Sequence, residues 1–220
     1  LKIVVIGGHG TIGKYIVKAL KENDKTAEIW IGGRPKKDKK SEERYVDVDI
    51  SDTKSVESFF SHVKEIDHLI ISAGYDGPFG PVSKLTKEDI AKGFNSKAFG
   101  QIDVVLQAAK NSSINEKGTI TLTTGMLDQL VVPLAAGLSA VNGAVNSFVR
   151  AVATEMPRGI RVNAVSPGLL VETVPHFGSV TRGFKPVEGP DVALAYIRSI
   201  YSGLSGRIFE VLGSSHVQEK

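Results

Sequence analysis

A glycine-rich turn near the amino terminus has residue types and spacing suited to binding a phosphate group. It comprises Gly7, Gly8, His9, Gly10, Thr11, Ile12 and Gly13. Glycines permit a tight turn and let the backbone approach a pyrophosphate, which then lies at the amino terminus of the following helix. The G-x-G-x-x-G spacing that starts at Gly8 is weak alone, but here it lies between an apolar strand and a helix. The motif therefore predicts that these residues bind a dinucleotide.

The residue that follows the second predicted strand indicates which dinucleotide. An acidic residue at this place would hydrogen-bond the ribose 2′-hydroxyl of NAD. This sequence instead has Arg34, directly after a pair of glycines. A guanidinium can bind a 2′-phosphate with two donors, whereas a carboxylate would repel it. The sequence therefore predicts NADP(H) as the cofactor.

Alternating strands and helices must position this turn. Strands are predicted over 2–6, 27–31, 44–48, 67–72, 118–124, 160–166 and 207–212, and helices over 11–22, 53–64, 87–110, 135–156 and 190–202. Most strands are short apolar runs, as expected where helices cover both faces of a parallel sheet. Thr86 and Asp89 predict a capping box for the third helix, and Pro157 is expected to end the fourth. We predict one α/β domain over 1–220, with a doubly wound, Rossmann-type, mainly parallel sheet of seven strands in three α/β/α layers.

Composition narrows the classes of partner. The chain has 220 residues, a net charge of +3 and no Cys, which excludes disulfides and Cys-ligated metal and fits a reducing, cytoplasmic compartment. The five His are scattered, so no metal is expected, and the charge is too small to favour nucleic acid. No apolar run approaches the roughly 18 residues of a membrane span. We expect no signal peptide, a trimmed amino terminus, and a solvated loop at the basic run 36–40.

Motifs along the whole chain resemble those of the short-chain dehydrogenase/reductase family. Residues 5–13 resemble its amino-terminal glycine motif, 49–52 its adenine-contacting segment, and 72–74 its Asn-Ala-Gly. Residues 161–168 are similar to its R-V-N-x-x-x-P-G, and 206–213 to its last strand. The resemblance implies that the cofactor also contacts Asp49, Ile50, Ser72, Ala73, Gly74, Pro167 and Gly168. It further implies a homodimer or homotetramer, built partly on the helices 87–110 and 135–156.

The family's usual proton donor is missing from this sequence. In the family, a Tyr donates the proton, and a Lys four residues later lowers the pKa of that Tyr and binds the nicotinamide ribose. The resemblance aligns Leu138 with that Tyr and Asn142 with that Lys. No Tyr occurs between Tyr75 and Tyr196, so a shift of the alignment does not restore the motif. The resemblance therefore indicates a divergent branch of the family.

Two further positions of the family's catalytic set have changed. The usual Asn aligns with Lys97, and the usual Ser aligns with Gly125, next to Thr124. Lys97 thus stands where Asn is expected, and Asn142 where Lys is expected. We predict an Asn/Lys exchange that keeps one ammonium near the cofactor ribose, with Lys97, Thr124 and Asn142 as the catalytic residues. The alternative is that Lys97 is an exposed helix lysine and the exchange is a coincidence.

Other residues are candidates for the missing acid, and they come from loops at the carboxyl edge of the predicted sheet. They are Tyr75, Glu172, His176 and Asp128, and none has a firm role. The segment 167–189 is rich in apolar residues and predicts either a cover over a pocket or a plain connecting loop.

Two classes of function remain open. The first is an NADP(H)-binding oxidoreductase with an atypical catalytic site that acts on an unidentified small carbonyl or alcohol. The second is a non-catalytic NADP(H)-binding protein, either redox-responsive or degenerate. The glycine loop with Pro167 and Gly168 favours the first, and the lost Tyr favours the second.

Overall fold

A computed structural model of the chain describes residues 1–35, 44–75 and 77–213. Within this part, seven strands form one sheet in the order β3-β2-β1-β4-β5-β6-β7, and every neighbouring pair is parallel. They are β1 (Lys2–Ile6), β2 (Glu28–Gly33), β3 (Tyr45–Asp47), β4 (Ile66–Ile71), β5 (Ile114–Thr123), β6 (Arg161–Pro167) and β7 (Ile208–Val211). The strand order reverses between β1 and β4, where open α/β sheets bind ligands. The predicted doubly wound, Rossmann-type fold is confirmed.

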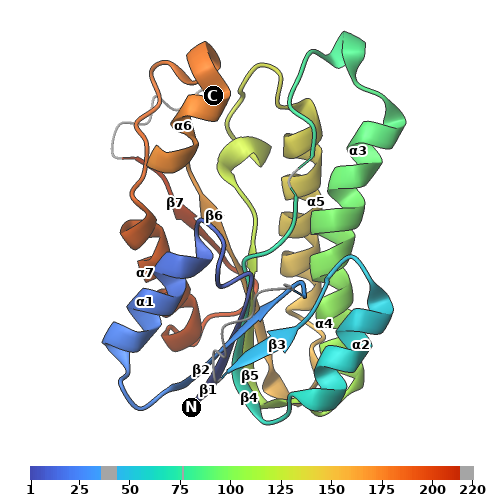
Figure 1. The fold of residues 1–220 in the computed structure, drawn as a ribbon, viewed down its shortest axis with the longest axis vertical. Helices are drawn as coiled ribbons and strands as arrows, with labels where there is room; N and C mark the ends of the chain where they lie inside the picture. Colours follow the sequence, from blue (N-terminus) through green and yellow to red (C-terminus); the bar gives the residue numbers. More distant parts are fainter. Residues whose placement is uncertain (36–43, 76, 214–220) are drawn as a thin grey trace.

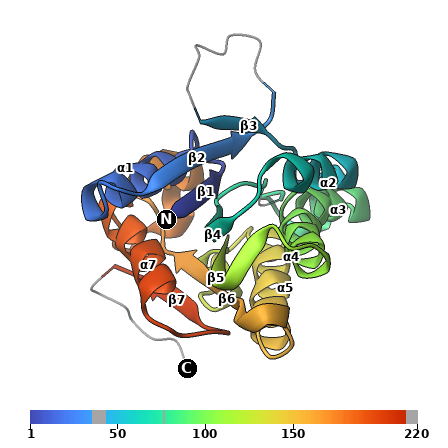
Figure 2. The same ribbon diagram turned by 90° about the horizontal axis from the view of Figure 1, so that it is seen from below.

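Helices cover both faces of this sheet. Figures 1 and 2 show α1 (Gly13–Asn23) and α7 (Gly189–Tyr201) on one face, and α2 (Thr53–His62), α4 (Gly100–Lys110) and α5 (Ala136–Val152) on the other. Alternate residues of β1 point to opposite faces: Val4 and Ile6 join the core beneath α2, α4 and α5, whereas Ile3 and Val5 pack under α1 and α7. This two-sided burial explains why the strands are continuous apolar runs. No helix of the described part is long and apolar enough to cross a membrane.

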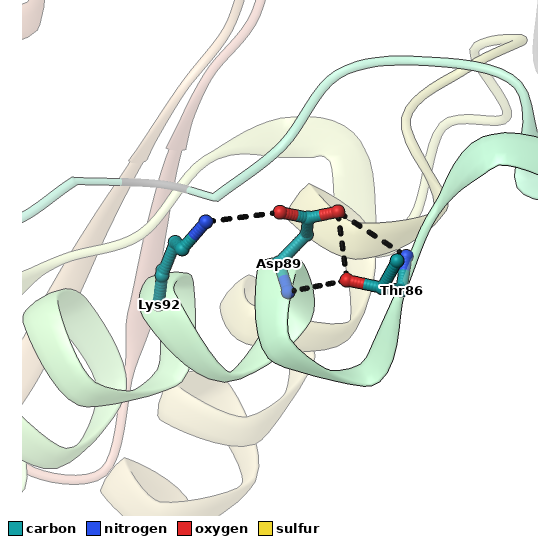
Figure 3. Close-up of polar contacts among 3 residues, drawn as sticks. All are labelled: Thr86, Asp89 and Lys92. Carbon is teal, nitrogen blue, oxygen red and sulfur yellow. Dashed lines mark hydrogen bonds and ion pairs between the residues drawn. The ribbon is translucent and has the colours of Figure 1, made fainter.

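The helix predicted over 87–110 consists of three joined parts. They are α3 (Lys87–Gly93), the π-helical segment η2 (Phe94–Phe99) and α4. The predicted capping box at its start is confirmed, since the Thr86 hydroxyl accepts from the Asp89 amide and the Asp89 carboxylate accepts from the Thr86 amide (Figure 3). Lys92, one turn later, donates to the same carboxylate. The π-helical turn, a feature that often occurs at functional sites, contains Lys97.

Two predicted boundaries are wrong for local reasons. The fourth helix ends at Val152 rather than 156, because the amides of Thr154 and Glu155 bond three residues back in a tighter turn. The fifth strand begins at Ile114 rather than 118, through an irregularity at Lys117, which has a φ of 61°. Neither change reaches the carboxyl ends of the strands.

The segment 167–189 is an ordered cover rather than a plain connecting loop. It contains η5 (Val171–Thr173), α6 (Val174–Phe177) and η6 (Gly178–Thr181), and a parallel bridge between Leu170 and Val187 closes its base. Its apolar side chains pack with others from the loop after β5. This apolar cluster contains Met126, Val132, Ala135 and Leu169, with Val174, Phe177, Val180 and Phe184 against it. The cover therefore lies over the carboxyl ends of the strands, at the top of Figure 1.

Candidate functional site

Two cavities lie side by side along the carboxyl edge of the sheet. The larger, of about 770 Å³, extends from the glycine turn to the ends of β2 and β3. The smaller, of about 300 Å³, lies beneath the cover segment 167–189. Both are lined by Ser72, Ala73 and Gly74, which directly follow β4. These three predicted residues therefore stand where the two cavities meet, at the reversal of strand order.

The glycine turn divides its residues between the cavities and the packing beneath them. Gly7, His9 and Gly10 line the larger cavity, and Thr11 and Ile12 the smaller. Gly7 has a φ of +86°, and a Cβ there would overlap the carbonyl oxygen of Ser72.

The two remaining glycines of the turn line neither cavity. A Cβ at Gly13 would overlap the carbonyl oxygen of Gly7, and one at Gly8 would press on the side chain of Ile31 at 3.0 Å. The structure thus places Gly8 and Gly13 in the close packing of the turn against α1 and β2.

The far end of the larger cavity carries Arg34, the first residue after β2. The Tyr45 hydroxyl donates to the Arg34 carbonyl oxygen at 3.0 Å, and the Tyr45 ring meets the ring of His9 edge-on, with 5.7 Å between centroids. Tyr45 therefore connects the glycine turn to the arginine, a role for which the sequence carried no signal. The basic run 36–40 lies outside the described residues.

Asp49 and Ile50 also line the larger cavity. The Asp49 carboxylate accepts from the Ser51 hydroxyl at 2.6 Å and from the Ser51 amide at 3.0 Å. These hydrogen bonds lower the pKa of Asp49, and the positive charge of Arg34 lowers it further. The carboxylate is thus held ionised by its own loop.

Lys97, Asn142 and Thr124 meet at the wall of the smaller cavity, although they come from η2, α5 and the residue after β5. The Lys97 ammonium donates to Asn142 Oδ1 at 2.8 Å and to the Thr124 carbonyl oxygen at 3.1 Å. Lys97 is 3% exposed and Asn142 2% exposed. Lys97 is therefore not the exposed helix lysine of the alternative interpretation.

Thr124 and Gly74 support this lysine through the backbone. The Thr124 hydroxyl donates to the Val165 carbonyl at 3.4 Å, so Thr124 offers the ammonium a carbonyl oxygen rather than its side chain. Gly74 has a φ of +126°, and a Cβ there would lie 2.9 Å from Lys97 Cα. Only a glycine lets the turn after β4 pass this close beneath the π-helical segment.

The usual Tyr is replaced, and the other candidates for a proton donor do not line the smaller cavity. Leu138, aligned with the usual Tyr, lines the smaller cavity with a hydrocarbon side chain. Tyr75 is 55% exposed and lines the larger cavity. Glu172 accepts a hydrogen bond from Tyr15 at 2.5 Å, which raises the pKa of Tyr15 and lowers that of Glu172.

Neither Asp128 nor His176 lines the smaller cavity. The Asp128 carboxylate accepts from the Asn146 side chain at 2.6 Å. Among the described residues, Lys97 is consequently the sole ionisable side chain in the wall of the smaller cavity.

The rest of that wall is mainly apolar. Pro167 and Gly168 lie at the end of β6, and the Gly168 amide donates to the Val211 carbonyl at 2.8 Å. Leu169, Leu170 and Phe177 also line this cavity, and they belong to the apolar segment 167–189, for which a cover over a pocket was one of the two predictions. The wall residues Met126, Leu127 and Val132, from the loop after β5, were not assigned from the sequence. Within the described residues, no three His, Asp or Glu side chains gather as metal ligands.

Known proteins share this architecture. A family model described as Enoyl-(Acyl carrier protein) reductase matches residues 9–185. An uncharacterised oxidoreductase of Methylorubrum extorquens is 27% identical over 160 residues, which cover 72% of this chain and 60% of that protein. The match thus spans less than two thirds of the relative's length.

Two solved structures cover nearly the whole chain. The protein lin1944 from Listeria innocua is 35% identical, with a TM-score of 0.85 over 96% of this chain and 99% of that one. A small-chain dehydrogenase in complex with NADPH is 28% identical, with a TM-score of 0.79 over 96% and 95%. Together with the parallel sheet and the glycine turn, these matches show that the chain belongs to the short-chain dehydrogenase/reductase family.

Proposed function

We propose that the chain is an NADP(H)-dependent oxidoreductase that interconverts a carbonyl group and an alcohol. The observation that carries this proposal is the pair of adjoining cavities at the carboxyl edge of the sheet. One has the glycine turn and Arg34 at its two ends, and the other has a buried ammonium in a wall whose other described residues are uncharged. This arrangement suits a long anionic cofactor beside a small substrate.

The residues of the larger cavity fit a dinucleotide. The glycine turn lets no side chain intrude at Gly7, and α1, which begins at Gly13, has no side-chain hydrogen bond from its N-cap residue Ile12. Uncapped amides at a helix amino terminus bind phosphate. Arg34 stands where a carboxylate would select NAD, so its guanidinium would hold a 2′-phosphate. The similar small-chain dehydrogenase in complex with NADPH supports this choice of nucleotide.

The smaller cavity would receive the nicotinamide end and the substrate. When bound, the nicotinamide supplies or accepts a hydride at the substrate carbon. The chain's own residues bind and orient the cofactor and substrate and exclude water from them. The cover and its apolar cluster close the cavity, and Asn142 and Thr124 hold the Lys97 ammonium. We infer that Lys97 and Asn142 exchange the places of the family's Asn and Lys, which makes this a divergent branch.

Nucleotide binding tests the proposal directly. We expect the wild-type chain to bind NADPH more tightly than NADH, measured by nicotinamide and Trp30 fluorescence. Arg34→Ala should weaken NADPH binding by about tenfold or more, because a charge-assisted bidentate contact is lost, and leave NADH binding unchanged. Arg150→Ala, an exposed arginine on α5, is the matched control. An unaltered preference in Arg34→Ala would contradict the assignment, and binding of neither nucleotide would refute the proposed function.

A second comparison tests the exchanged lysine. Lys97→Ala should weaken NADPH binding far more than Lys92→Ala, because Lys92 lies on the same helix but pairs with Asp89 at the surface (Figure 3). Equal effects of the two changes would show that the buried lysine does not support the cofactor.

We also propose a homodimer or homotetramer built partly on the helical regions 87–110 and 135–156. Phe99 and Leu106 are 55% and 43% exposed, and Ile102 lies between them at helical spacing. Light scattering should give a dimeric or tetrameric mass for the wild-type chain and a lower mass for the double variant Phe99→Ser, Leu106→Ser. A monomeric wild type would contradict this assembly.

A further inference from the structure

The cover segment 167–189 is joined to α1 by a hydrogen bond between two side chains. The Tyr15 hydroxyl, in the first turn of α1, donates to Glu172 Oε1, in η5 of the cover, at 2.5 Å. The two residues lie 157 positions apart in the chain. Building on the proposed function, we propose that Tyr15 and Glu172 are positioning residues that hold the cover closed over bound NADP(H) and slow its release.

Tyr15 also contacts the chain where the cover ends. A Cβ at Gly189 would overlap two ring carbons of Tyr15, so the ring lies directly against the backbone of this glycine. Gly189 is buried and is the first residue of α7. The ring of Tyr15 therefore packs where the cover ends, while its hydroxyl bonds Glu172 near the start of the cover.

The hydrogen bond to Glu172 lies where the chain leaves the base of the cover. At that base, the Val171 amide donates to the Val187 carbonyl oxygen at 3.1 Å and ties the two ends of the cover together. Glu172 is the next residue, and Thr173 and Phe177 beyond it line the smaller cavity. The contact with Tyr15 therefore fixes the direction in which the chain turns over this cavity.

The same turn of α1 carries residues of the smaller cavity. Thr11 and Ile12 line that cavity, and the Tyr15 amide donates to the Ile12 carbonyl oxygen at 3.0 Å. In the proposed function, the phosphates of the cofactor lie at the amino terminus of this helix. One helical turn would then hold both the cofactor and the cover, so loss of the contact should be detectable in cofactor release.

Electrostatics strengthen the contact. The hydrogen bond from Tyr15 lowers the pKa of Glu172, and the positive charge of Lys14 adds to this effect. The same hydrogen bond raises the pKa of Tyr15. The Lys14 ammonium itself lies 4.9 Å from the centroid of the Tyr15 ring. A protonated tyrosine thus donates to an ionised carboxylate near neutral pH, and such a charge-assisted bond is stronger than one between neutral groups.

The far side of the cover is held by a different kind of contact. The ring of Phe177 meets the ring of Phe79, from the loop after β4, edge-on with 5.2 Å between centroids. This contact is apolar and does not involve α1. The Tyr15–Glu172 bond can therefore be removed while the apolar packing of the cover stays in place.

Substitutions on both sides isolate the hydrogen bond. Tyr15→Phe removes the hydroxyl and keeps the ring against Gly189. Glu172→Ala removes the acceptor, whereas Glu172→Gln keeps an acceptor oxygen without the charge. Tyr201→Phe, at the 48% exposed tyrosine that ends α7, is the matched control.

Two measurements report on the cover. The first is the rate of NADPH release, followed by stopped-flow nicotinamide fluorescence with excess NADP⁺ as the trap. The second is the rate of trypsin cleavage after Arg182, an exposed residue of the cover, with the fragments identified by mass spectrometry. Urea unfolding of every variant shows whether the fold is intact.

We expect Tyr15→Phe and Glu172→Ala each to speed NADPH release by about three- to tenfold, and to speed cleavage after Arg182 in the NADPH complex. The double variant should release NADPH within about twofold of the faster single variant, because both changes remove the same bond. Glu172→Gln should fall between the wild type and Glu172→Ala, and Tyr201→Phe should match the wild type.

Three outcomes would overturn the inference. They are wild-type release rates in Tyr15→Phe and a folded Glu172→Ala, single effects that multiply in the double variant, and faster release without faster cleavage after Arg182. Tyr15→Phe removes one atom from the surface of its ring, so it remains informative if Glu172→Ala fails to fold. In each case NADPH still binds, whereas a wild type that binds neither nucleotide would refute the proposed function and the role in release together.

Discussion

The contact between the Lys97 ammonium and Asn142 Oδ1 should be measurable as an interaction energy. The two atoms are 2.8 Å apart, and both side chains are almost completely buried. Asn142→Ala removes this acceptor, whereas the hydrogen bond from the ammonium to the Thr124 carbonyl stays in place. A hydrogen bond to a charged group contributes about 1.5–3 kcal/mol, and the vacated space costs up to about 1 kcal/mol more. We therefore expect Asn142→Ala to lower the free energy of unfolding by about 2–4 kcal/mol.

Lys97→Met probes the same contact from the other side. It leaves two buried carbonyl oxygens without this donor, at an expected loss of about 1–3 kcal/mol. The double variant lacks both sides of this hydrogen bond, so the bond is lost once rather than twice and the combined loss should be smaller than the sum of the single losses. The difference, the coupling energy, should be about 1–2 kcal/mol.

Urea unfolding followed by circular dichroism gives all four free energies of this cycle. Lys92→Met is the control. Lys92 is exposed, so this variant should unfold at the same urea concentration as the wild type. Losses that add to within about 0.5 kcal/mol would show that the two side chains do not depend on each other. That result would refute the assignment of Asn142 as the residue that holds the ammonium.

Three further perturbations follow from the geometry. Gly74→Ala should lower the free energy of unfolding by about 2 kcal/mol or more and weaken NADPH binding, whereas Gly80→Ala, with open space around its Cβ, should leave both unchanged. Equal effects of the two changes in urea and fluorescence titrations would argue against the close approach of Gly74 to Lys97. Burial lowers the pKa of His68 to about 4, below its value of about 6.5 in the unfolded chain. The free energy of unfolding should therefore fall by at most about 3 kcal/mol as the pH drops from 6.5 to 4. In urea unfolding, His68→Gln should reduce this pH dependence and His62→Gln, at an exposed position, should not; an unchanged pH dependence in His68→Gln would contradict the burial. Tyr196→Phe removes a buried hydroxyl that lies 2.7 Å from the Thr123 hydroxyl of β5, and it should lower the free energy of unfolding by about 1 kcal/mol. The NADPH dissociation constant should stay the same; a changed constant would place Tyr196 in the site.

The fold could be predicted from the sequence because its signals are local. Short apolar runs alternate with helical segments, and the glycine turn stands directly between the first strand and the first helix. The capping box of Thr86 and Asp89 depends on residues three apart and was correct. Boundaries were less accurate where tertiary packing tightens a turn or adds an irregular strand, as at Thr154 and Lys117.

The site depended on alignment for its candidates and on structure for their surroundings. The resemblance matched Lys97 and Asn142 to exchanged positions, but their hydrogen bond and burial arise from η2 and α5, 45 residues apart. Tyr75 was a candidate acid because it directly follows the Ser-Ala-Gly turn. The structure places it in the larger cavity instead.

The sequence by itself determined the order of the strands and helices along the chain, the glycine turn and the arginine that follows β2, because each is encoded by neighbouring residues. Only the tertiary structure decided which side chains share a cavity. It turned Gly8 and Gly13 toward the packing, folded the segment after β6 into a cover, and left Lys97 as the ionisable group of the smaller cavity wall in the described part of the chain. The physical reason is that the carboxyl ends of parallel strands, distant in the chain, meet at one edge of the sheet, and burial there depends on all of them at once.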